Sequence, residues 1–177
     1  MKIGILGGGQ LARMLIEAGS RFGFDFLIYS TEKNSPAGRI CEKEYFGKWD
    51  DFGALDEFTE KSDVITLENE FIDYKIIEHI EQQGGLVMPG SQVVKTIQDK
   101  LIQKKFLKKI GAPIAVFNEI NYIGDIKNFC GQYGYPVILK SRTMGYDGKG
   151  NYQINSERDI EPAFLGLSTR GSLMVEQ

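Results

Sequence analysis

The first 22 residues constrain the fold more than any other stretch, because a strand pattern runs directly into a glycine turn and then a helix. Residues 3–6 are apolar, and glycines occupy positions 7, 8 and 9. The apolar positions of residues 11–22 then recur at helical spacing. This order begins a Rossmann-like unit, and the turn together with Ala12 matches its G-x-G-x-x-G/A pattern. The sequence therefore predicts an N-terminal α/β domain with a parallel sheet.

The residues after the second strand disfavour a dinucleotide at this turn. NAD sites place an acidic residue at the end of that strand, where it holds the ribose hydroxyls. Here the expected strand 26–29 is followed by Ser30 and Thr31, and Glu32 comes one residue late. The free N–H groups at a helix N-terminus still attract phosphate or carboxylate groups. We therefore expect the turn to hold an anion other than NAD.

A third apolar strand, residues 63–67, ends in Glu68-Asn69-Glu70. Ligands of open α/β sheets collect at the carboxyl ends of the strands. Of the two carboxylates, Glu68 continues the strand most directly. We expect Glu68 to face the crevice, with a solvated strand end as the alternative.

Three segments are expected along the chain. Residues 1–90 would form the Rossmann-like domain, closing with a helix at 74–82 and a strand at 86–88. Residues 91–112 would be a connection built on one lysine-rich helix, 92–110, whose lysines are mostly a solvated face. Residues 113–177 alternate strand and helix patterns and would form a compact α+β domain.

A second glycine-rich stretch, Lys140 to Asn151, follows the apolar run 136–139. It contains three glycines and three cations, and it ends before a short strand pattern at 152–154. Glycines let backbone N–H groups fold around an anion, and cations neutralise it. The pattern indicates a flap over a polyphosphate, with Lys140 held on the preceding strand. A charged hairpin loop without a ligand is the alternative.

Composition narrows the possible partners. The formal net charge is −3 and the pI about 5.3, so neither nucleic acid nor an acidic membrane is expected to bind. Two distant cysteines and one histidine match no metal-ligand spacing, and His79 is expected on a solvated helix face. With no targeting segment or membrane span in the sequence, we expect a cytoplasmic protein.

The strand with its terminal lysine, G-Y-P-V-I-L-K, followed by G-Y-D-G-K-G, resembles the small lid domain of the ATP-grasp superfamily. Within it, the stretch is similar to the 5-(carboxyamino)imidazole ribonucleotide synthetases. Three departures are visible: Met144 stands where the family usually has glycine, Phe71 where it has asparagine, and Lys100 where it has arginine. The resemblance implies a Rossmann-like pre-ATP-grasp domain, then a small α+β lid, with the C-terminal ATP-grasp domain absent from this chain.

The resemblance also implies roles for individual residues. Lys140 and Lys100 would be the catalytic cations that clamp the phosphates of ATP. The implied nucleotide contacts are these two lysines with Gly145, Tyr146, Asp147, Gly148, Lys149, Gly150, Asn151, Glu176 and Gln177. The implied ribonucleotide contacts are Gly8, Gly9, Gln10, Leu11, Glu68, Tyr146 and Asp147. No metal ligand is identified within the chain, and those for Mg²⁺ are expected beyond residue 177.

The implied reaction is ATP-dependent carboxylation of aminoimidazole ribonucleotide by bicarbonate, through carboxyphosphate, in purine biosynthesis. We expect a homodimer at full length and no activity from the 177 residues alone. Two alternatives stay open. One is another ATP-grasp ligase that joins a carboxylate to an amine, and the other is a truncated nucleotide-binding or interaction module.

Overall fold

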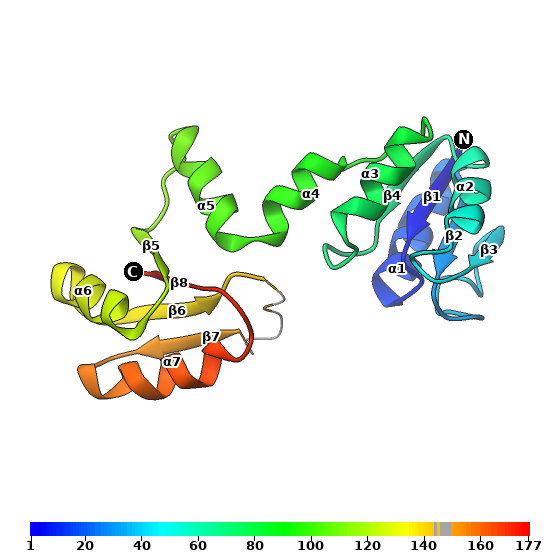
Figure 1. The fold of residues 1–177 in the computed structure, drawn as a ribbon. Coiled ribbons are helices and arrows are strands. Elements are labelled where there is room, and N and C mark those ends of the chain that lie inside the picture. Colours follow the sequence, from blue (N-terminus) through cyan, green and yellow to red (C-terminus); the bar gives the residue numbers. More distant parts are fainter. Residues whose placement is uncertain (144, 146–149) are drawn as a thin grey trace. The chain divides into compact units, whose positions relative to one another are not determined.

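A computed structural model of the chain describes residues 1–143, 145 and 150–177. The chain forms two compact units, residues 1–95 and 96–177, and the expected connection 91–112 spans their division. Each unit contains one four-stranded sheet, parallel in the first and antiparallel in the second (Figure 1). The α/β class and the order of the two domain types predicted from the sequence are confirmed.

The first unit is a parallel sheet with the strand order β3-β2-β1-β4. Its strands are β1 (Lys2–Leu6), β2 (Asp25–Ser30), β3 (Lys43–Phe46) and β4 (Val64–Leu67). Its helices are α1 (Gln10–Gly19), the 3-10 turn η1 (Ser20–Phe22), α2 (Phe52–Glu60), α3 (Tyr74–Gln82) and the start of α4 (Ser91–Gln98). The strand expected at 86–88 is reduced to a single bridge between Val87 and Ile65.

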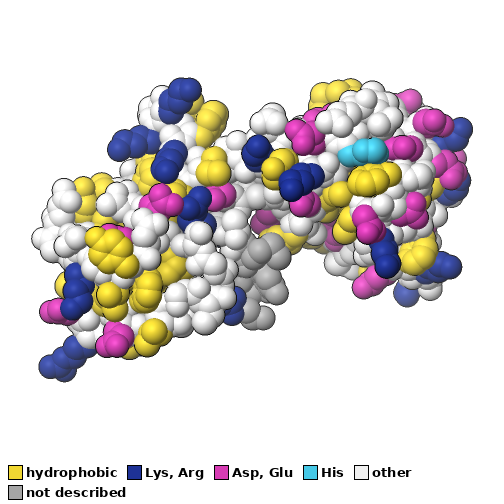
Figure 2. All heavy atoms as spheres, in the orientation of Figure 1, with side chains coloured by type: hydrophobic (Ala, Val, Ile, Leu, Met, Phe, Trp, Pro, Cys, Tyr) yellow, Lys and Arg dark blue, Asp and Glu magenta, His cyan; other side chains and the backbone are white. Residues whose placement is uncertain are grey.

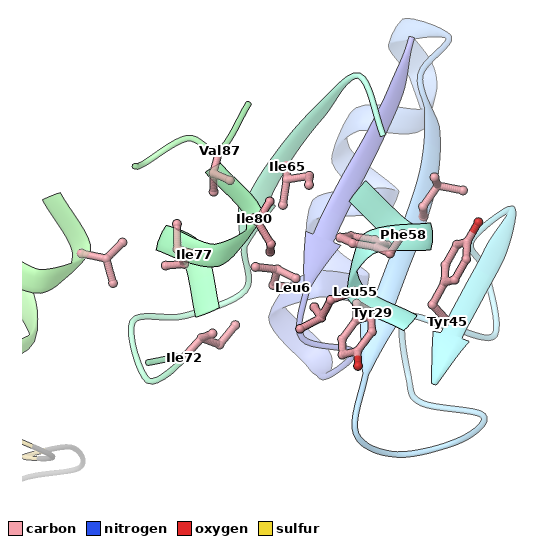
Figure 3. Close-up of a cluster of buried hydrophobic side chains, with 12 residues drawn as sticks. Leu6, Tyr29, Tyr45, Leu55, Phe58, Ile65, Ile72, Ile77, Ile80 and Val87 are labelled. Carbon is pink, nitrogen blue, oxygen red and sulfur yellow. The ribbon is translucent and has the colours of Figure 1, made fainter. Parts of the chain in front are cut away.

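Helices cover both faces of this sheet, as successive strand residues show. On β1, Ile5 packs with Ala12 and Ile16 of α1, whereas the next residue, Leu6, packs with Phe58 of α2. Figure 3 shows the buried cluster that contains Leu6 and Phe58, in which Tyr29 and Tyr45 lie beside Phe58. A sheet buried on both faces requires the continuous apolar strands that the sequence contains.

His79 is a correction to the expected solvated helix position. Its Nε2 lies 2.8 Å from Oδ1 of Asp56, and its ring packs against that of Phe52 at 4.4 Å between centroids, with the ring planes tilted by 40°. Only 21% of its side chain is exposed. Helix α3 therefore uses this histidine to pack against α2.

The second unit is an antiparallel sheet with the strand order β5-β8-β6-β7. Its strands are β5 (Phe117–Ile120), β6 (Val137–Ser141), β7 (Asn151–Ile154) and β8 (Leu173–Glu176). Its helices are α5 (Lys100–Lys109), α6 (Ile123–Tyr133), the 3-10 turn η2 (Glu157–Asp159) and α7 (Ile160–Ser168). One face of the sheet packs on α6 and α7.

The prediction of a single helix over residues 92–110 is wrong. The structure contains two helices, α4 and α5, separated at Asp99. The carboxylate of Asp99 accepts hydrogen bonds from the amides of Leu101 and Ile102, at 2.9 and 3.2 Å. This is an N-cap, which starts a new helix at Lys100. The apolar spacing that we used continues across the break and does not reveal it.

Candidate functional site

Lys140 lies on the face of the antiparallel sheet opposite to α6 and α7. On β6, Val137 and Leu139 are fully buried against those helices, so Lys140 faces the other way. On β8, Val175 is buried on the helix side, which puts Glu176 on the same face as Lys140. The ammonium of Lys140 forms an ion pair with the Glu176 carboxylate. The strand-borne lysine predicted from the sequence is therefore present and has a carboxylate partner.

Lys100 reaches the glycine flap, by which we mean residues 145–151. It is the first residue of α5, and its backbone N–H donates to the carbonyl of Arg142 at 2.8 Å. A Cβ added at Gly145 would lie 2.9 Å from the Lys100 ammonium nitrogen. The structure thus places Lys100 where the flap begins, four residues beyond the end of the strand that carries Lys140.

Arg142, one of the three cations of the stretch, has carboxylate partners of its own. Its Nε and Nη2 bind Asp99, the latter at 2.6 Å, and its Nη1 lies 2.6 Å from Oε1 of Glu119. Burial alone would raise the pKa of the Asp99 carboxyl, but hydrogen bonds from Arg142 and from two backbone amides hold that pKa below its usual value. Arg142 therefore fastens the start of α5 to the end of β6, and its charge is already matched.

Glu176 is shared between two lysines. Its Oε2 lies 2.6 Å from Nζ of Lys104, while its Oε1 pairs with Lys140. Burial acts to raise the pKa of the Glu176 carboxyl, yet the ammonium groups of Lys104 and Lys140 hold the pKa below its ordinary value. Lys104 was included in the solvated face that the sequence suggested, and that interpretation is wrong for it. Its position four residues after Lys100 was the available signal, because such residues share one side of a helix.

The two ends of the flap approach each other closely. A Cβ added at Gly150 would lie only 2.8 Å from the backbone Cα of Gly145. Asn151 then begins β7, where it pairs with Lys140 across the ladder. Gln177 is exposed and donates from Nε2 to the carbonyl of Tyr133 at 3.2 Å. The remaining flap positions predicted from the sequence, Tyr146, Asp147, Gly148 and Lys149, lie outside the described residues.

This close approach predicts a cost for a side chain at Gly150. Gly150→Ala is expected to destabilise the second unit by about 1–3 kcal/mol, because the new methyl group meets backbone that cannot rotate away. Gly131→Ala is the matched control. Its Cβ would meet nothing within 4 Å in helix α6, so it should stabilise by about 0.5–1 kcal/mol. Urea unfolding of both variants measures the difference, and equal effects would contradict the prediction.

The first unit has its own pocket, of about 310 Å³, at the carboxyl ends of β1, β2 and β4. Its lining includes Gly7, Gly8, Gly9 and Glu68, together with side chains from other segments. Gly7 has a φ of +104°, which favours glycine. The expected location of a ligand crevice beside the first glycine turn is thus matched by a pocket.

Glu68 occupies the N-terminus of α1. Its Oε2 accepts a hydrogen bond from the Gly9 amide at 2.9 Å, and its carboxylate lies where Cβ atoms on Gly7 and Gly9 would otherwise be. The anion that the turn holds in this structure is therefore the protein's own carboxylate. The Gly9 amide already donates to Glu68. The pocket wall therefore offers a ligand the Glu68 carboxylate, which is a hydrogen-bond acceptor.

The other predicted contacts of this pocket are less enclosed. Gln10 and Leu11 begin α1 directly after the turn, and both side chains are exposed. The pocket has further lining residues from β2 and two loops, whose proximity depends on the fold and is not predictable from local sequence: Ser30, Ser35 and Trp49. Glu32, which we considered one residue too late for a ribose contact, also lines the pocket.

The described residues contain no group of three His, Cys, Asp or Glu side chains that could hold a metal ion. No magnesium site is therefore identified among the described residues. In the same part of the chain, every helix is too short or too polar to cross a membrane.

Two family profiles match this chain and identify the class of protein to which it belongs. The profile of the ATP-grasp domain matches residues 105–177, which include Lys140, the flap ends and Glu176. The profile of the ribonucleotide synthetase pre-ATP-grasp domain matches residues 1–98, more than half of the chain. The chain belongs to the N5-carboxyaminoimidazole ribonucleotide synthetase family of ATP-grasp proteins, and it corresponds to their N-terminal portion.

Individual relatives agree with this assignment. The N5-carboxyaminoimidazole ribonucleotide synthase of Staphylococcus haemolyticus is 36% identical over 161 residues, which are 91% of this chain and 43% of that protein. The synthetase of Staphylococcus aureus complexed with ADP superposes with a TM-score of 0.89 at 31% identity, covering 99% of this chain and 47% of that one. The Aspergillus clavatus enzyme with ADP and 5-aminoimidazole ribonucleotide gives 0.82 at 32% identity, covering 99% and 46%. The chain thus spans about half the length of these relatives.

Proposed function

We propose that this chain provides the nucleotide-clamping lid and the ribonucleotide pocket of an enzyme that carboxylates 5-aminoimidazole ribonucleotide with bicarbonate, using ATP. The observation that carries the proposal is a pair of lysines on the segments next to the glycine flap: Lys140 lies on β6, and the Lys100 ammonium lies 2.9 Å from where a Cβ on Gly145 would be. Phosphoryl transfer depends mainly on positioning and on neutralising the phosphate charge. Two lysines beside a glycine flap supply both.

The chemistry divides between the two units. In the second, Lys140 and Lys100 would hold the phosphates while bicarbonate attacks the terminal phosphorus, which releases ADP and forms carboxyphosphate. The amine of the ribonucleotide then attacks the carboxyl carbon, and phosphate leaves. In the first unit, the Glu68 carboxylate would accept a hydrogen bond from an amine or hydroxyl group of the ribonucleotide, because it is an acceptor held rigidly by the Gly9 amide.

Ligand binding tests the proposal on the chain itself. The ¹⁵N-labelled chain is titrated with ADP and, separately, with 5-aminoimidazole ribonucleotide, and amide shifts are followed by NMR. We expect ADP to shift the resonances of Lys100, Lys140 and Gly150, and the ribonucleotide to shift those of Gly9 and Glu68. An amino acid that binds in place of the ribonucleotide would favour another carboxylate–amine ligase. No response to ADP would overturn the proposal.

Activity is tested in a chimera. Residues 1–177 replace the matching N-terminal part of the Staphylococcus haemolyticus enzyme, since the chain covers 43% of it. We expect release of phosphate from ATP only when bicarbonate and aminoimidazole ribonucleotide are both present. A well-folded chimera whose ATP turnover ignores the ribonucleotide would contradict the proposed substrate.

Glu68→Gln separates the role of charge from the role of shape in the first unit. The glutamine oxygen can still accept from the Gly9 amide, so the fold should be kept, while the negative charge is lost. We expect ribonucleotide affinity to fall about tenfold, as for one charge-assisted hydrogen bond, with ADP affinity unchanged. Glu57→Gln, on an exposed surface pair, is the control. Equal ribonucleotide affinity in the two variants would count against Glu68 as a contact.

A further inference from the structure

One lysine of α5 differs from its neighbours. Lys105, Lys108 and Lys109 are exposed, and Figure 2 shows basic side chains gathered over this helix. By contrast, only 20% of the Lys104 side chain is exposed, and its Nζ lies 2.6 Å from Oε2 of Glu176. Exposed surface pairs contribute little, but this pair is largely shielded from water and so is screened less.

Lys104 changes the charge that Lys140 can present. Glu176 carries one negative charge and lies between two ammonium groups, so the three side chains together keep a net charge of +1. Without Lys104, the whole carboxylate would be free to pair with Lys140, and that pair would be neutral. An anion arriving at Lys140 would then compete with Glu176 for the same ammonium.

We propose that Lys104 is a positioning residue for Lys140: it holds one oxygen of Glu176, which leaves Lys140 with unmatched positive charge for the phosphates of a nucleotide. Lys104 does not touch the nucleotide in this arrangement and acts through Glu176. The inference rests on the proposed nucleotide site.

The test measures ADP affinity of the chain by NMR titration in four variants. Lys104→Met and Lys104→Gln remove the charge, and both are expected to weaken ADP binding about tenfold. Lys104→Arg keeps the charge and should restore affinity to within about threefold of the parent chain. Lys109→Met removes an exposed charge from the same helix and should change affinity less than about twofold. If Lys104→Met does not fold, Lys104→Gln alone tests the loss of the charge.

A double-mutant cycle separates positioning from mere structural support. In a Glu176→Gln background the competing carboxylate is gone, so adding Lys104→Gln should no longer weaken ADP binding. If the loss persists in that background, or if the single variants bind ADP as well as the parent chain does, the inference is overturned and the proposed function stands. If the parent chain itself binds no ADP, both the inference and the proposed function fall.

Discussion

Lys140→Ala is expected to abolish detectable ADP binding while leaving the fold intact. Truncation removes the cation proposed to hold phosphate, and loss of a charged contact to phosphate weakens binding by about 2–3 kcal/mol, or about 30- to 150-fold. The fold should survive because Glu176 keeps its 2.6 Å pair with Lys104 and is not left as an uncompensated buried charge.

Calorimetric or NMR titration with ADP measures this loss, and thermal unfolding monitors the fold. Lys109→Ala is the matched control, because it removes an exposed lysine from the same unit. If Lys140→Ala binds ADP with the affinity of that control, Lys140 has no part in holding phosphate. If it unfolds while Lys109→Ala does not, the pair with Glu176 is primarily structural.

Arg142→Met is expected to have the second largest effect, and it should act on stability and binding together. The substitution leaves the carboxylate of Asp99, whose side chain is 16% exposed, without its guanidinium partner. We expect a loss of about 2–3 kcal/mol in the free energy of unfolding, because a largely buried carboxylate loses its charged hydrogen bonds. ADP affinity should also fall, because Lys100 follows Asp99 directly and depends on this anchor.

Arg170→Met is the control for this variant, since Arg170 is exposed in the same unit. Urea unfolding gives the stabilities, and ADP titration at low urea gives the affinities. If Arg142→Met lowers affinity without lowering stability, Arg142 contacts the nucleotide directly, and its assignment as an anchor is wrong. If neither quantity changes, the contacts with Asp99 and Glu119 contribute nothing.

Local patterns predicted much of this structure. The strand that carries Lys140 was predictable because a buried β-branched run ends in a cation before a glycine cluster. The glycine turn after β1 was predictable because strand, turn and helix follow within a few residues. In both places the information lies in neighbouring residues, and the structure confirmed the two sheets that they imply.

The features that the sequence did not predict depend on interactions between residues that are distant in sequence. Asp99 ends one helix and caps the next, but its guanidinium partner lies 43 residues further on. Lys104 looks like any other surface lysine until Glu176, which is distant in sequence, folds beside it. Trp49 and Ser35 line the first pocket only because the sheet brings their loops to its edge. Periodicity and residue spacing along the sequence do not indicate such pairings.

The hydrogen bond from the Lys100 amide to the Arg142 carbonyl has a consequence for motion. It joins the first residue of α5 to the residue just past the end of β6, and the Arg142 guanidinium joins the same two segments again. Any rotation of the antiparallel sheet must therefore carry Lys100 along as part of one rigid body. The backbone positions from which the two lysine side chains extend are then set by folding, before a nucleotide arrives.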